Sequence, residues 1–144
     1  MDKKTILLVE DNPDDEELIM MSLRKHGIAN AVEVVHDGQE ALDRLLGPAA
    51  PPGPEAGSLP TLVLLDLKLP KVDGLEVLQR LRADERTRLQ PVVILTSSDE
   101  ERDRLASYAS GANSYVCKPV EFAAFADAVK QLGLYWLLLN KPPM

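Results

Sequence analysis

Short apolar runs alternate along the chain with longer stretches that mix apolar and polar residues. Five of these runs are too short for a helix and end at turn or charged residues, as strands of a parallel sheet buried on both faces do. The runs are Thr5–Val9, Ala31–His36, Thr61–Leu65, Pro91–Leu95 and Ser114–Cys117. Each is followed by apolar residues at helical spacing. Such alternation predicts an α/β fold, a doubly wound parallel sheet with helices on both faces.

Capping signals mark where the helices start. Asn12 is a good N-cap, and Pro13 fits the first helical position. Three capping boxes follow: Asp37 with Glu40, Asp73 with Glu76, and Ser98 with Glu101. A fifth helix is expected from about Glu121. The apolar residues of the five helices are Leu18, Ile19, Met21 and Leu23; Ala41, Leu42, Leu45 and Leu46; Leu75, Leu78 and Leu81; Leu105, Ala106 and Ala109; and Phe122, Phe125, Val129 and Leu132. The first two sets are expected to form one apolar face each, and the third and fifth sets to pack inward.

The length of 144 residues suits a single domain. We expect its core to span about residues 4–131. Residues 47–60 are rich in proline and glycine and predict a projecting insertion rather than a domain boundary. The extension 132–144 carries a segment that is apolar all round, which predicts a lengthened last helix that either folds back on the domain or binds a partner. Because the sequence stops at Met144, no output domain is expected.

Charge and composition exclude several classes. A net charge of −7 disfavours nucleic acids and anionic membranes as partners. With one cysteine, Cys117, the chain has no internal disulfide, and no Cys/His cluster has zinc-ligand spacing. No signal peptide or membrane span is visible, so a cytoplasmic location is expected.

Polar side chains stand where the predicted strands end. Glu10 and Asp11 follow the first strand and Asp66 the third, Thr96 ends the fourth, and Lys118 follows the fifth. Because parallel strands present their carboxyl ends at one edge of the sheet, these side chains are expected to converge. Each has an ordinary explanation taken singly, since Asp66 could simply begin a turn and Lys118 could be a surface lysine. The five together are much less expected by chance.

Three crowded carboxylates repel one another unless a cation joins them. Oxygen ligands of this kind suit Mg²⁺ better than zinc. A threonine hydroxyl and a lysine ammonium beside them complete a cradle for a phosphoryl group. The residues therefore predict Mg²⁺-dependent phosphoryl chemistry at this edge.

The sequence resembles the receiver domains of two-component response regulators. The matching stretches are residues 7–13 (LLVEDNP), 64–74 (LLDLKLPKVDG), 94–98 (ILTSS) and 111–119 (GANSYVCKP), and the resemblance covers nearly the whole chain. It implies a flavodoxin-like (βα)5 fold with strand order 2-1-3-4-5. It also implies a signalling protein rather than an enzyme with steady turnover, one that takes a phosphoryl group from the phosphohistidine of a sensor kinase.

The resemblance assigns a role to each matching residue. Asp66 looks like the phosphoacceptor. Mg²⁺ would be held by Asp11, Asp66 and the main-chain carbonyl of Lys68, with Glu10 acting mostly through water. Thr96 and Lys118 would bind phosphoryl oxygens. Thr96 and Tyr115 would form the conformational switch, and the Lys118–Pro119 bond would be cis.

The sequence also departs from the usual receiver pattern. Glu10 stands where aspartate is more common, and the 47–60 insertion is longer than the norm. The insertion, the apolar helix end and the proline-ended tail are similar to stand-alone regulators that pair with bacterial phytochrome kinases. That resemblance implies a phytochrome-type donor and a homodimer through the last helix, with a contact patch at Leu134, Tyr135, Trp136 and Leu137.

Other functions remain open at this point. A phosphatase with an aspartyl nucleophile would want a second acid two residues after Asp66, where Lys68 stands. A flavin or dinucleotide binder would want a glycine-rich fingerprint, which is missing, and more than 4% aromatic residues. An interaction protein with an inactive site is disfavoured by the intact Asp66, Thr96 and Lys118. Within the receiver family, the chain could instead be a phosphorelay shuttle or a phosphate sink.

Overall fold

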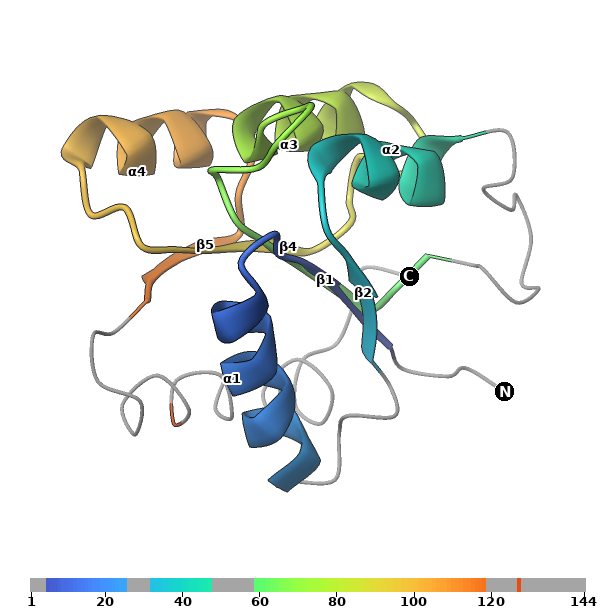
Figure 1. Ribbon diagram of the computed structural model, residues 1–144. Coiled ribbons are helices and arrows are strands. Elements are labelled where there is room, and N and C mark those ends of the chain that lie inside the picture. Colours follow the sequence, from blue (N-terminus) through green and yellow to red (C-terminus); the bar gives the residue numbers. More distant parts are fainter. Residues whose placement is uncertain (1–4, 26–31, 48–58, 119–126, 128–144) are drawn as a thin grey trace.

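Five parallel strands form one sheet in the computed structural model (Figure 1), which describes residues 5–25, 32–47, 59–118 and 127. The strand order is β2-β1-β3-β4-β5. Within the described residues the elements are β1 (Ile6–Val9), α1 (Pro13–Lys25), β2 (Val32–Val35), α2 (Gly38–Leu46), β3 (Leu62–Leu65), α3 (Gly74–Ala83), β4 (Val92–Thr96), α4 (Glu101–Ala109) and β5 (Ser114–Cys117). The predicted doubly wound fold and its strand order are confirmed.

Helices cover both faces of the sheet. Figure 1 shows α1 on one face and α2, α3 and α4 on the other. Successive side chains of a strand point to opposite faces, so each apolar run supplies two cores. On the α1 side, Leu8 and Leu64 pack with Ile19 and Leu23. On the other side, the core contains Leu7, Val9, Val63, Leu65, Val77, Leu78 and Leu81 among others.

Three of the predicted helix starts are formed as expected. The Asn12 side chain accepts hydrogen bonds from the backbone N–H groups of Asp14 and Asp15, at 2.9 and 3.1 Å. Asp37 accepts from the N–H of Glu40 at 2.7 Å. Asp73 accepts from the N–H of Glu76 at 3.0 Å. These caps begin α1, α2 and α3 directly after the loops that leave the carboxyl edge of the sheet.

The predicted start of α4 was wrong. The helix begins at Glu101, two residues later than a Ser98 cap requires, because the chain stays extended at Glu100. The Ser98 hydroxyl instead donates to the carboxylate of Asp103. Leu105 and Ala109 are exposed, and Ser107 is the residue that α4 buries. Met21, which was predicted on the apolar face of α1, is 43% exposed.

Several predicted features lie outside the described residues. They are most of the 47–60 insertion, the fifth helix and the 132–144 extension, apart from Asp127, which is helical. The Lys118–Pro119 bond and the patch Leu134–Leu137 fall there too. Among the helices that the structure does describe, none has the length and apolar character needed to span a bilayer.

Candidate functional site

The strand ends bring the predicted acidic residues together. Glu10 and Asp11 follow β1, and Asp66 follows β3, its hydrogen-bonded neighbour. One carboxylate oxygen from each lies within 4.8 Å of the other two. Glu10 and Asp66 are buried, whereas Asp11 is exposed, so the cluster opens toward solvent on the Asp11 side. Hard oxygen donors packed this closely form a set that fits a divalent cation such as Mg²⁺.

Lys118 places its ammonium among these carboxylates. Its Nζ donates to Glu10 Oε1 at 2.7 Å, to Asp15 Oδ2 at 2.8 Å and to Asp66 Oδ2 at 3.2 Å. The Lys118 side chain is only 6% exposed. Burial alone would lower its pKa, but the hydrogen bonds to Asp15 and Glu10 and the charge of Asp66 outweigh burial and raise that pKa above its ordinary value. These contacts favour the charged form of Lys118 inside the site.

Glu10 is a carboxylate buried at a cost. Burial raises its pKa from 4.5 to about 7, although the bond to Lys118 acts in the opposite direction. Its other oxygen accepts from the backbone N–H of Asn12 at 3.2 Å. An additional cation beside Glu10 would stabilise its charged form. The position thus favours binding of a cation.

Asp66 is held by the loop that joins β3 to α3. The backbone N–H of Lys68 approaches Asp66 Oδ1 at 3.4 Å, and the N–H of Gly74 donates to the carbonyl of Leu67 at 2.9 Å. A Cβ atom on Gly74 would lie 2.1 Å from the carbonyl oxygen of Asp66, closer than atoms can approach. Gly74 is therefore required for the close approach of α3 to the site.

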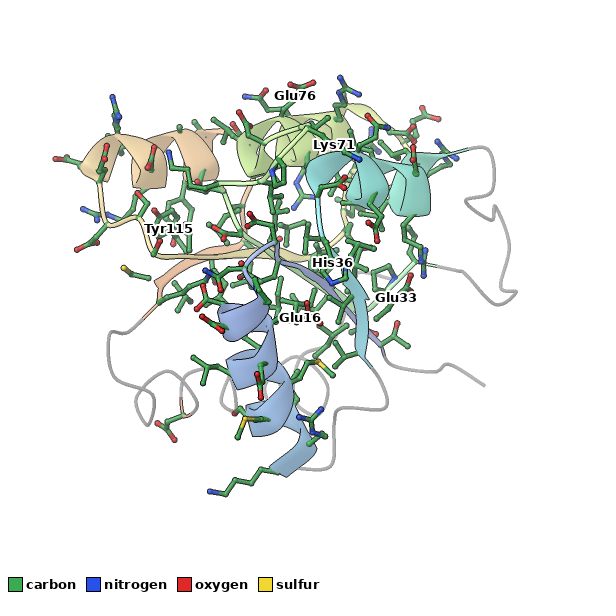
Figure 2. All side chains as sticks on the ribbon, in the orientation of Figure 1. Glu16, Glu33, His36, Lys71, Glu76 and Tyr115 are labelled. Atoms are coloured by element: carbon green, nitrogen blue, oxygen red, sulfur yellow. The ribbon has the colours of Figure 1, made fainter. Side chains whose placement is uncertain are left out.

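Thr96 and Tyr115 are connected through Ser98. Thr96 is fully buried at the end of β4, and its Oγ1 accepts from the backbone N–H of Ser98 at 3.3 Å. The hydroxyl of Tyr115, on β5, donates to the carbonyl of the same Ser98 at 2.7 Å. Tyr115 is half-buried on the α4 side of the sheet (Figure 2). Burial raises the pKa of its hydroxyl. One loop residue thus contacts both predicted switch residues.

Asp15 is a site residue that the sequence analysis missed. Its carboxylate contacts Lys118 as closely as Glu10 does. Its position in the acidic first turn of α1, where negative charge suits the positive helix end, gives it a sufficient local explanation. No local pattern in the sequence reports this contact, because Lys118 lies 103 residues away along the chain.

Fold and site together define a doubly wound α/β protein with an acidic cluster and a buried lysine at the carboxyl edge of its sheet. The family description "Response regulator receiver domain" matches residues 6–130. The chain therefore belongs to the response regulator receiver family.

Among curated proteins, the chain is 43% identical over 140 residues to the "Probable methanogenesis regulatory protein FilR2" of Methanothrix harundinacea, covering 96% of this chain and 86% of that protein. It is 35% identical over 134 residues to "Response regulator Rcp1" of Synechocystis, covering 93% and 89%. Some curated relatives are longer: the chain spans 57% of the "DNA-binding dual master transcriptional regulator RpaA" of Synechocystis.

Solved structures with the same fold include phytochrome-associated regulators. The phosphorylated cyanobacterial phytochrome response regulator RcpA has a TM-score of 0.87 at 35% identity, covering 99% of this chain and 100% of that one. The Mn²⁺-bound form of Rcp1 has a TM-score of 0.85 at 34% identity, covering 98% and 99%. The bacteriophytochrome response regulator AtBRR has a TM-score of 0.71 at 51% identity, covering 98% and 100%.

Proposed function

We propose that this protein accepts a phosphoryl group on Asp66 from the phosphohistidine of a sensor kinase and signals by a conformational change. The observation that carries the proposal is the placement of the Asp66 carboxylate, buried at the edge of the sheet between two further acids and 3.2 Å from the Lys118 ammonium. The similarity to a regulator described as phosphorylated supports it.

In the proposed step, an Asp66 oxygen attacks the phosphorus atom of the phosphohistidine. An O–P bond forms, the P–N bond breaks, and the imidazole nitrogen leaves with the electron pair. Lys118 would stabilise negative charge on a phosphoryl oxygen, and the Thr96 hydroxyl would donate to another. Positioning and charge neutralisation supply most of the catalysis in reactions of this kind. The chain acts as a stoichiometric acceptor that takes part in its own phosphorylation.

The acidic cluster fits Mg²⁺ by donor type and spacing. Asp11, Asp66 and the main-chain carbonyl of Lys68 would hold the ion, with Glu10 acting through water. When bound, the ion would neutralise charge on the reacting phosphoryl oxygens. The Mn²⁺-bound form of Rcp1, a protein with the same fold, supports binding of a divalent ion.

The switch would run through Ser98. When Thr96 turns toward a phosphoryl oxygen, its contact with the Ser98 backbone is lost, and the Ser98 carbonyl that holds the Tyr115 hydroxyl would move with it. This is a two-state element biased by a local change of charge. The cis Lys118–Pro119 bond and a homodimer through Leu134, Tyr135, Trp136 and Leu137 remain predictions.

For the donor, we propose a bacteriophytochrome-type histidine kinase, because AtBRR is 51% identical. The 43% identity to FilR2, a protein described as a methanogenesis regulator, favours a second candidate donor, a sensor kinase of another kind. A role as a shuttle or phosphate sink for such a kinase remains a prediction. The test is transfer of labelled phosphate from purified phosphorylated kinases of both kinds, with and without EDTA. We expect label on the parent protein with Mg²⁺, none on Asp66→Asn, and faster transfer from the phytochrome kinase. Equal rates from both kinases would contradict the choice of donor, and label on Asp66→Asn would contradict the acceptor.

A further inference from the structure

Asp15 contacts Lys118 but stands apart from the acidic cluster. The distance from Lys118 Nζ to Asp15 Oδ2 is 2.8 Å. Among the described residues, the carboxylates close enough to share a cation are those of Glu10, Asp11 and Asp66, and Asp15 is not one of them. A lysine ammonium has three N–H donors. Glu10, Asp15 and Asp66 therefore account for all three donors of Lys118.

The position of Asp15 is fixed by its own helix. Its backbone N–H donates to the Asn12 side chain at 3.1 Å, in the capped first turn of α1. The positive end of the helix favours a carboxylate there. Lys118 comes from the opposite end of the sequence, after β5. The Asp15–Lys118 contact thus ties the lysine to a rigid element that is separate from the acidic cluster.

The three contacts of Lys118 respond differently when the site is occupied. Asp66 makes the longest contact, and phosphorylation would convert its carboxylate to an acyl phosphate. Glu10 belongs to the group that would surround the metal. Asp15 belongs to neither group, so its contact is the one that remains available to Lys118 in every state of the site.

We propose that Asp15 is a positioning residue, which holds the Lys118 ammonium where it reaches a phosphoryl group on Asp66. This inference rests on the proposed function. Losing the carboxylate would leave Lys118 free to move toward Glu10, and the phosphoryl group would lose a well-placed donor.

The experiment measures the dissociation constant of fluoroberyllate, a non-covalent mimic of the phosphoryl group, at saturating Mg²⁺. Asp15→Asn is compared with Asp14→Asn, which removes one charge from an exposed neighbour in the same helical turn. Both changes are repeated in a Lys118→Ala background. Urea unfolding and the affinity for Mg²⁺ alone are measured for each variant.

We expect Asp15→Asn to weaken fluoroberyllate binding about tenfold, the loss of part of a charge-assisted hydrogen bond. We expect Asp14→Asn to change it less than about twofold, since exposed charges interact weakly. In the Lys118→Ala background, Asp15→Asn should have no further effect, because Asp15 acts through the lysine. The single variants Asp15→Asn and Asp14→Asn should have the same affinity for Mg²⁺.

The inference is overturned if Asp15→Asn and Asp14→Asn weaken fluoroberyllate binding equally, or if the Asp15 effect persists without Lys118. It is also overturned if the loss of fluoroberyllate affinity in Asp15→Asn is accompanied by a matching loss of Mg²⁺ affinity or of stability, and does not depend on the presence of Lys118. A parent protein that fails to bind fluoroberyllate with Mg²⁺ present would overturn the proposed function, and this inference with it. If the parent binds fluoroberyllate and Asp66→Asn abolishes that binding, the proposed function is supported. The Asp15 comparison then tests the positioning role alone.

Discussion

Replacing Lys118 with methionine tests how the site is held together. The change keeps a long side chain of similar bulk and removes the ammonium that contacts Glu10, Asp15 and Asp66. Glu10 is 1% exposed, so its charge cannot be compensated by solvent after the change. We expect the Mg²⁺-free protein to lose about 3–5 kcal/mol of unfolding free energy near pH 8, the usual cost of leaving a buried charge without its partner.

The loss should depend on pH. Near pH 5.5, Glu10 is largely protonated in the folded parent, because burial raises its pKa to about 7. Removing Lys118 then leaves a neutral carboxyl instead of an unpaired charge. We therefore expect the loss to shrink to about half at that pH. Added Mg²⁺ should restore part of the stability at pH 8, since a second cation takes the place of the first.

The assay is urea unfolding of the parent and Lys118→Met at both pH values, with EDTA or with Mg²⁺. Lys25→Met is the matched control, because Lys25 is exposed in the last turn of α1. A loss below about 1 kcal/mol near pH 8, similar to that of an exposed ion pair, would refute the reasoning. So would a loss that is the same at both pH values.

Three further predictions concern the groups around Asp66. Because the pKa of Glu10 is raised, the folded state holds its proton more tightly than the unfolded chain does, so Mg²⁺-free stability should fall by about 3 kcal/mol as pH rises from about 4.5 to about 7. Glu10→Gln should remove this part of the pH dependence. If urea unfolding gives the variant the same pH dependence of stability as the parent, the prediction is contradicted. Gly74→Ala should cost about 2 kcal/mol or more, because its Cβ meets the Asp66 carbonyl; a loss below about 0.5 kcal/mol in urea unfolding would contradict the clash. Asp73→Ala should cost about 1 kcal/mol by removing the α3 cap, and the cost should be absent when the same change is made at exposed Asp99.

The sheet and the acidic cluster could be predicted from the sequence because few arrangements satisfy the pattern. Apolar runs such as Leu62–Leu65 bury both faces of a strand only inside a parallel sheet. A residue that follows such a run must then lie at the carboxyl edge. This logic placed Glu10, Asp66 and Lys118 together without any knowledge of side-chain geometry.

The features that could not be predicted are those for which local sequence signals do not determine tertiary contacts. Ser98 has the spacing of a capping box, yet its hydroxyl bonds Asp103 and its carbonyl accepts from Tyr115, so the helix begins later. Leu105 fits an apolar stripe by spacing, but the face of α4 that meets the sheet carries Ser107. Asp15 has a local explanation at the positive end of α1, and its contact with Lys118 depends on a long-range approach that no local pattern reports.

Intact mass after incubation with Mg²⁺ and acetyl phosphate, beside Asp66→Asn, tests the central claim most directly. The account predicts that the parent gains one phosphoryl group and that the variant, with its fold intact by circular dichroism, gains none. A gain that survives in Asp66→Asn would show that another residue is the acceptor and would contradict the account.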